Sequence, residues 1–221
     1  MQTAFRSDEK FTQAEYWDWL EELPASDINR YELLGGRILM TPPAWAGHSL
    51  VAVRISSALE SYRRTTGSGL VLESSAGFDL PSGDTLQPDV TFISAARRTT
   101  GLMSKPKGFI DVVPDLVVEV LSPSTARRDR IEKKKVYELC GVDEYWLVDP
   151  RRREVTIFAR DGDSFGEPCV FRAGALTSRV LHGIGMLTSE SVATHGPVRD
   201  IGATLTYASG LALGVTALIA L

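Results

Sequence analysis

The chain has 221 residues, 43% of them hydrophobic, which is enough to bury one sizeable core. Its formal net charge of −4 excludes a surface that attracts polyanions over its whole extent, so any nucleic-acid site must be local. Cys140 and Cys169 form no CxxC pair, which excludes a disulfide framework and a zinc signature and fits a reducing cytoplasm.

The N-terminal part of the chain predicts two helices and a hairpin. Residues 1–10 are charged and lack an apolar core, so we expect no secretory signal and a cytoplasmic protein. Thr12 and Glu15 form a capping box at the start of a short amphipathic helix. Residues 31–40 contain two strand-like runs around a glycine pair and predict a hairpin. Apolar residues then recur with helical spacing over about 48–64.

The rest of the chain predicts mostly strands. We expect strands over 70–80, 89–93, 116–121 and 145–148, with a helix over about 126–140 before the last of them. Residues 155–158 and 169–171 predict antiparallel strands added near the edge. The order helix, strand, strand, strand, helix, strand indicates an α/β fold.

Two acidic residues stand within apolar runs. Asp89 opens one run after Pro88, and Glu119 interrupts another, 116–121, which we expect to be covered on both faces of a sheet. A buried carboxylate costs several kcal/mol unless a positive charge compensates it. Mg²⁺ or Mn²⁺ shared by Asp89 and Glu119 would compensate both acids and keep positions for a phosphate and a water. Alternatively, Asp89 is a solvated residue in a turn and binds no metal.

A lysine accompanies these acids. Steps of 100° per residue place Lys133 on the packed face of the predicted helix 126–140, whereas Lys134 and Lys135 turn to solvent. An ammonium group on that face requires a carboxylate or phosphate nearby. Two alternatives remain: Lys133 pairs with Asp129 one turn earlier, or its side chain extends so that the ammonium reaches solvent at the edge of the helix.

Other hydrolase and cofactor classes lack their signatures. The three histidines have no metal-ligand spacing, which argues against a zinc hydrolase. There is no Gly-x-Ser-x-Gly elbow, no phosphate-binding glycine loop before a helix and no dinucleotide fingerprint.

Several motifs occur together in this chain: Tyr31-Glu32-Leu33, His48, Gln87-Pro88-Asp89-Val90, residues 115–125, Asp129 with Lys133 and Tyr137, and residues 141–150. With these motifs, residues 11–187 resemble the Uma2 family, which belongs to the PD-(D/E)xK superfamily of restriction-endonuclease-like nucleases. The resemblance implies a mixed sheet with helices on both faces, in the element order given above. The Glu-x-Lys motif of the superfamily would put its lysine at position 121, where this chain has leucine, so the lysine is expected to have moved to Lys133.

The resemblance implies roles for these residues. Asp89 and Glu119 are the expected metal ligands, with the Val120 carbonyl as a third oxygen. Lys133 would orient the attacking water or stabilise the transition state. Glu32 is either an auxiliary carboxylate or a surface acid of the hairpin, and His48 either contacts a substrate phosphate or caps its helix.

The predicted function is a Mg²⁺-dependent or Mn²⁺-dependent DNA endonuclease, in which a metal-activated water hydrolyses the phosphodiester bond. A homodimer is expected if both strands are cut. A catalytically inactive DNA-binding module of the same fold is an alternative. Basic residues near the site in sequence could bind phosphates or lie in solvated loops: Arg97, Arg98, Lys105, Lys107, Arg127, Arg128 and Arg130.

The C-terminal part differs from the rest. We expect a nuclease-like domain over 1–187 and an extension over 188–221. Within the extension, 201–221 contains no charged residue and is long enough to form a membrane-spanning helix, or a helix that packs on a partner. A membrane-tethered interaction protein is therefore a third reading.

Overall fold

The computed structural model describes residues 5–41, 43–98, 109–172, 175–182, 184–188 and 215–219. Its main sheet has seven strands along the path β10-β9-β8-β7-β6-β3, with β11 added beside β9. β7 and β8 run parallel and the other neighbours in this sheet are antiparallel. The strands are β3 (Leu70–Glu73), β6 (Val90–Ile93), β7 (Leu116–Val120), β8 (Glu144–Asp149), β9 (Glu154–Asp161), β10 (Ser164–Phe165) and β11 (Cys169–Phe171). The predicted mixed sheet is confirmed.

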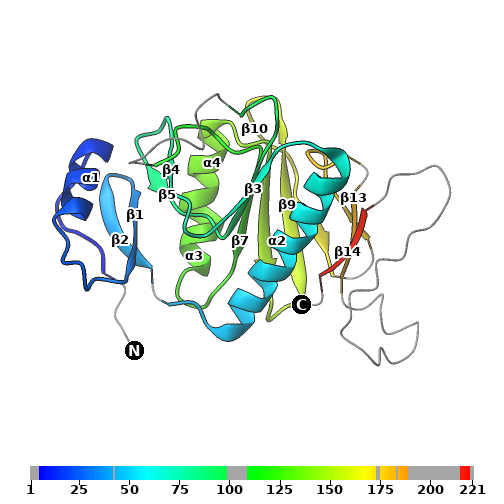
Figure 1. Cartoon of the computed structure of the whole chain (residues 1–221), viewed down its shortest axis with the longest axis horizontal. Helices are drawn as coiled ribbons and strands as arrows, with labels where there is room; N and C mark the ends of the chain where they lie inside the picture. Colours follow the sequence, from blue (N-terminus) through cyan, green and yellow to red (C-terminus); the bar gives the residue numbers. More distant parts are fainter. Residues whose placement is uncertain are drawn as a thin grey trace.

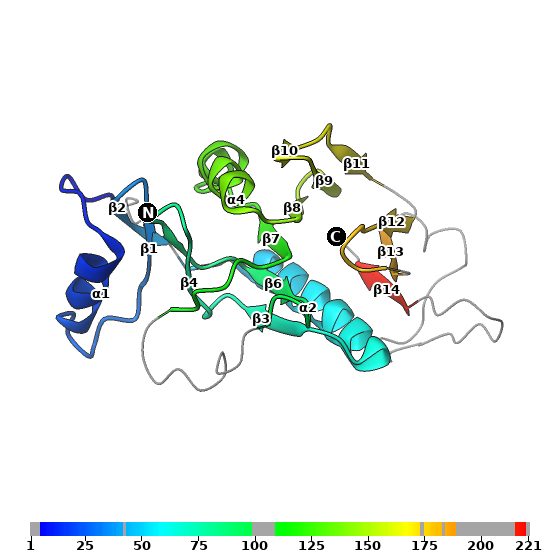
Figure 2. The same cartoon turned by 90° about the horizontal axis from the view of Figure 1, so that it is seen from above.

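Helices cover both faces of the main sheet (Figure 2). α2 (Ala46–Thr66) lies on one face, and α3 (Ala126–Arg128) with α4 (Lys134–Cys140) lies on the other. Among the elements of this layer the sequence order α2, β3, β6, β7, α3–α4, β8 is the predicted one. The single strand expected over 70–80 is wrong, because the structure divides it into β3 and β4 (Phe78–Asp79), which belong to different sheets.

The alternation of side chains along β7 decides which helix Glu119 faces. The odd and even positions of this strand divide between two apolar clusters: Leu116, Val118 and Val120 pack with α2, whereas Val117 and Leu121 pack with α4. Because successive side chains point to opposite faces, Glu119 faces the helical segment that carries Lys133.

One turn of the second helix departs from the predicted α-helix. Residues Asp129–Lys133 form a π-helical turn between α3 and α4, in which the Lys134 N–H donates to the Asp129 carbonyl. The Tyr145 hydroxyl donates to the same carbonyl at 2.9 Å. This second donor comes from β8 and supports the widened turn, a feature that often marks functional sites.

A second sheet, in the order β2-β1-β5-β4, lies with α1 (Gln13–Glu21) at one end of the molecule (Figure 1). Its strands are β1 (Arg30–Leu34), β2 (Arg37–Thr41), β4 (Phe78–Asp79) and β5 (Thr85–Leu86). The capping box of Thr12 and Glu15 and the hairpin β1–β2 are confirmed. Positive φ angles at Gly35 and Gly36, 61° and 73°, explain the glycine pair in this turn.

A third sheet comprises β12 (Ala175–Thr177), β13 (Ile184–Thr188) and β14 (Val215–Ile219), with β14 parallel to β13. The expectation of a helix over 201–221 is therefore wrong for residues 215–219, which find a strand partner in β13. The remainder of that segment lies outside the described residues. Within the described ranges, no helix is long and apolar enough to cross a membrane.

Candidate active site

Glu119 and Lys133 form the centre of a buried polar cluster. Lys133 is 2% exposed and Glu119 4%. The Lys133 ammonium Nζ lies 2.8 Å from Oε1 of Glu119, and the Tyr137 hydroxyl donates to the same oxygen at 2.9 Å. The structure thus joins the strand acid to the helix lysine, as the apolar surroundings of each predicted.

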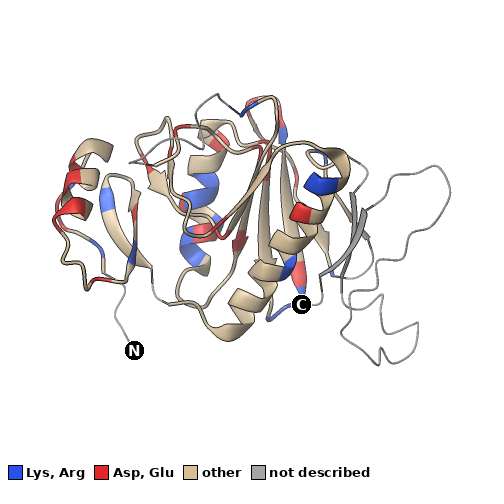
Figure 3. Cartoon of the chain, viewed as in Figure 1, with Lys and Arg blue, Asp and Glu red and all other residues tan. Residues whose placement is uncertain are grey.

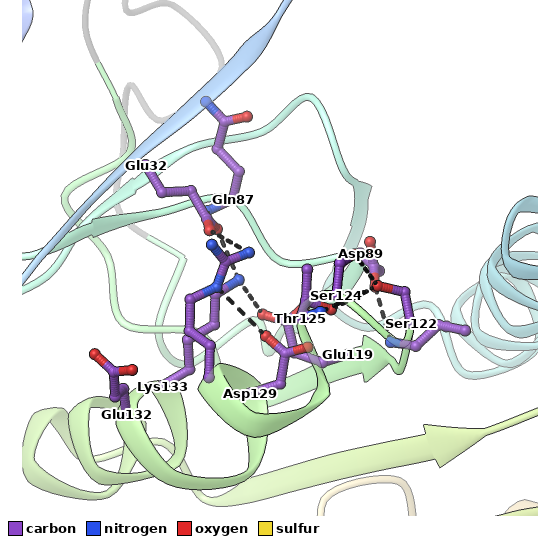
Figure 4. A network of polar contacts seen from close by, with 12 residues as sticks. Glu32, Gln87, Asp89, Glu119, Ser122, Ser124, Thr125, Asp129, Glu132 and Lys133 are labelled. Atoms are coloured by element: carbon purple, nitrogen blue, oxygen red, sulfur yellow. Dashed lines mark hydrogen bonds and ion pairs between the residues drawn. The ribbon is translucent and has the colours of Figure 1, made fainter. Parts of the chain in front are cut away.

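Glu32 is the third member of this cluster. It lies in the middle of β1, fully buried, and its Oε1 accepts hydrogen bonds from Lys133 at 2.7 Å and from the Gln87 backbone N–H at 2.9 Å. Figure 4 shows Glu32 and Lys133 directed toward each other. Glu32 is therefore not a surface acid of the hairpin. Glu32 interrupts an apolar strand as Glu119 does, and this pattern in the sequence could have identified it as a site residue.

Asp89 lies immediately before β6 and is 7% exposed. Its Oδ2 accepts a hydrogen bond from the Val120 N–H at 2.8 Å, which ties it to the residue after Glu119. His48 Nε2 lies 3.1 Å from the same oxygen. Asp89 is thus a buried acid rather than a solvated turn residue. His48 lies inside the first turn of α2, whose N-cap is Trp45, so it contacts Asp89 instead of capping the helix.

The charges of the cluster are not balanced. Among the described residues, four buried acids, Glu32, Asp89, Glu119 and Asp129, lie near two permanent cations, Lys133 and Arg128. Burial raises the pKa of Glu119 to about 8; Lys133 opposes this rise, and the negative charges of the other acids add to it. Burial also favours the neutral form of Glu32, but Lys133 and Arg128 outweigh it and lower the pKa of Glu32.

A cavity of about 370 Å³ lies beside these groups, and Asp89, Glu119, Val120, Asp129 and Lys133 line it. Within the described ranges, no three His, Cys, Asp or Glu side chains form a cluster that could hold a metal by themselves. Mg²⁺ commonly binds to only one or two carboxylates and completes its shell with water and substrate phosphate. The hard oxygen donors and the surplus of negative charge fit a divalent cation.

Few of the basic residues near the site in sequence reach the cavity. Arg97 pairs with Asp143 at 2.6 Å, and Arg130 pairs with Asp149 at 3.0 Å, so both hold the fold together. Arg128 lines the cavity. The remaining members are Arg98 and Arg127, both exposed, and Lys105 and Lys107, which lie outside the described residues. Figure 3 shows acidic and basic residues following one another closely along α3 and α4.

Comparisons with known proteins agree with this fold. A search of curated proteins gives no match. A crystal structure described as a putative nuclease belonging to DUF820, from Anabaena variabilis ATCC 29413, is similar over 77% of this chain and 90% of that chain, with 18% identity and a TM-score of 0.62. The family model Uma2, described as "Putative restriction endonuclease", matches residues 17–188. The chain therefore belongs to the Uma2 family.

Proposed function

We propose that the protein is a Mg²⁺-dependent or Mn²⁺-dependent endonuclease that hydrolyses DNA phosphodiester bonds. The observation that carries this proposal is the meeting of Asp89, Glu119 and Lys133, from three separate segments, in the wall of one cavity. Membership of the Uma2 family and the nuclease description of the Anabaena variabilis structure support it.

Asp89 and Glu119, with the Val120 carbonyl, would hold the metal. Bound there, a divalent cation supplies a Lewis acid that lowers the pKa of a water molecule and neutralises charge on the phosphate. The described contacts of Glu119 use Oε1 and those of Asp89 use Oδ2. Each carboxylate is therefore fixed through one oxygen, which orients the other.

Lys133 would act on the phosphate. An ammonium group has three N–H donors, and Lys133 directs two of them to Glu32 and Glu119. No described residue accepts from the third, which would serve a phosphate oxygen or the attacking water in the cavity that Lys133 lines. Glu32 keeps this ammonium in place and charged, since the neighbouring carboxylates raise the pKa of Lys133 despite its burial.

A nicking assay tests the proposal. Supercoiled plasmid is incubated with Mg²⁺ or Mn²⁺ and wild-type protein, Asp89→Ala, Glu119→Ala or the control Glu167→Ala, which removes an exposed acid. We expect nicking by wild type and control and its loss in the two site variants. Equal nicking by all four proteins would remove the assignment. Binding without cleavage in either metal would instead identify an inactive DNA-binding module, for which the leucine at position 121 is the supporting observation.

A further inference from the structure

An exposed tryptophan stands at the mouth of the site cavity. Trp45 is the N-cap residue of α2, lines the cavity and is 46% exposed. Its ring lies over Gly47, where a Cβ atom would overlap the six-membered ring of the indole. Because Gly47 has no side chain, the indole can pack directly against the first turn of α2. A large aromatic ring held against a helix and open to solvent is a surface on which a planar group can stack.

The groups proposed to take part in the reaction are more buried than Trp45. Asp89, Glu119 and Lys133 are each at most 7% exposed, although all three line the cavity. A stiff duplex cannot bend its backbone into a recess, so its phosphates approach such buried groups less closely than those of a flexible strand. An unpaired strand bends freely and can carry a phosphate into the cavity, while its bases remain free to stack on an aromatic side chain.

Two arginines provide positive charge in the same wall. Arg30 and Arg128 line the cavity, and their guanidinium groups are held through NH2, Arg30 by the Gln87 carbonyl at 2.9 Å and Arg128 beside Glu32 at 3.8 Å. Nε of each is buried without a hydrogen-bond partner in the described part of the chain, and Nε of Arg128 has an ion-pair contact with Oδ1 of Asp129 at 4.0 Å. Guanidinium groups with an unused donor in a cavity wall favour an anionic ligand.

We propose that this cavity binds an unpaired segment of DNA, with one base stacked on Trp45 and the neighbouring phosphates near Arg30, Arg128 and Lys133. This inference rests on the proposed function and names its substrate class: single-stranded regions, flaps or opened duplex rather than intact double helix. It also assigns Trp45 to substrate binding. The aromatic residues are scattered along the sequence, and their spacing does not indicate this role.

Binding of labelled oligonucleotides, measured by fluorescence anisotropy without divalent metal, tests this. A single strand is compared with its blunt duplex, using wild type, Trp45→Ala, Trp45→Phe and the control Leu139→Ala, which shortens another exposed apolar side chain. We expect the single strand to bind more tightly than the duplex. Trp45→Ala should weaken single-strand binding about tenfold, Trp45→Phe much less and the control not at all.

Two outcomes would overturn the inference: duplex binding as tight as single-strand binding, or equal single-strand binding by wild type and Trp45→Ala. A parallel measurement with Arg30→Gln should lower the dependence of log Kd on log salt by about 0.7, as expected for one lost phosphate contact to a single strand. An unchanged salt dependence would remove Arg30 from the site. If Trp45→Ala nicks DNA as fast as wild type and binds the single strand equally well, the nuclease proposal stands and this inference fails. If single-strand binding depends on Trp45 but no DNA is cleaved, this inference stands and the nuclease proposal fails.

Discussion

Replacing Lys133 by methionine removes one positive charge from the buried cluster while preserving most of the side-chain volume. Glu32 and Glu119 then lose the ammonium that lies 2.7 and 2.8 Å from their carboxylate oxygens. Glu119 tolerates this loss, because a pKa of about 8 already leaves it mostly protonated at neutral pH. Glu32 cannot do so without cost, since Lys133 is the main reason that its pKa is low.

The expected loss of stability is about 3–5 kcal/mol, the range for removing one partner of a buried ion pair. Urea unfolding followed by tryptophan fluorescence measures it, with Lys135→Met as the control because Lys135 is exposed on the same helix. Adding Glu32→Gln to Lys133→Met should recover part of the loss, since a neutral amide no longer needs the ammonium. Unfolding of Lys133→Met at the same urea concentration as wild type would refute the buried network.

Two further predictions concern pH and the π-helical turn. Glu119 has a pKa raised from 4.5 to about 8, so between these values the folded chain holds a proton that the unfolded chain releases. The free energy of unfolding should therefore fall as pH rises through this window, by up to about 1.4 kcal/mol per pH unit, and Glu119→Gln should flatten the slope; equal slopes in urea titrations would contradict the assignment. Tyr145→Phe removes the hydroxyl that donates to the Asp129 carbonyl and should cost about 1 kcal/mol, with faster amide hydrogen exchange near Asp129. Unchanged exchange there would show that the turn does not depend on Tyr145.

The central acids and the lysine could be found in the sequence because each is a charged residue where the pattern requires an apolar one. Helical periodicity separated the buried Lys133 from the exposed Lys135, and strand runs located Asp89 and Glu119. The expectation that Lys134 turns to solvent is wrong, because this residue is half-buried with its ammonium over the Phe158 ring. The reasoning from strand runs applies to Glu32 as well, yet its strand belongs to a different sheet. Only the folded chain shows that this second sheet brings Glu32 within hydrogen-bond distance of Lys133.

Other features depend on contacts between distant segments. The π-helical turn at Asp129 is supported by a hydroxyl from β8, so no pattern within the helix predicts it. Trp45 becomes a cavity residue only when α2 packs beside β7. The strand at 215–219 pairs with β13, a partner that the uncharged composition of 201–221 does not reveal.

The position of the lysine has a consequence for how the centre is assembled. Leu121, where the superfamily motif would place that lysine, packs in the apolar cluster that attaches α4 to the sheet. Both acids that would ligate the metal, however, come from the strand region, whereas the ammonium group of Lys133 belongs to the separate segment 126–140. A local opening that detaches this segment from the sheet would leave both acids in place but remove the Lys133 ammonium from them. Cleavage should therefore fail at denaturant concentrations at which the sheet is still folded.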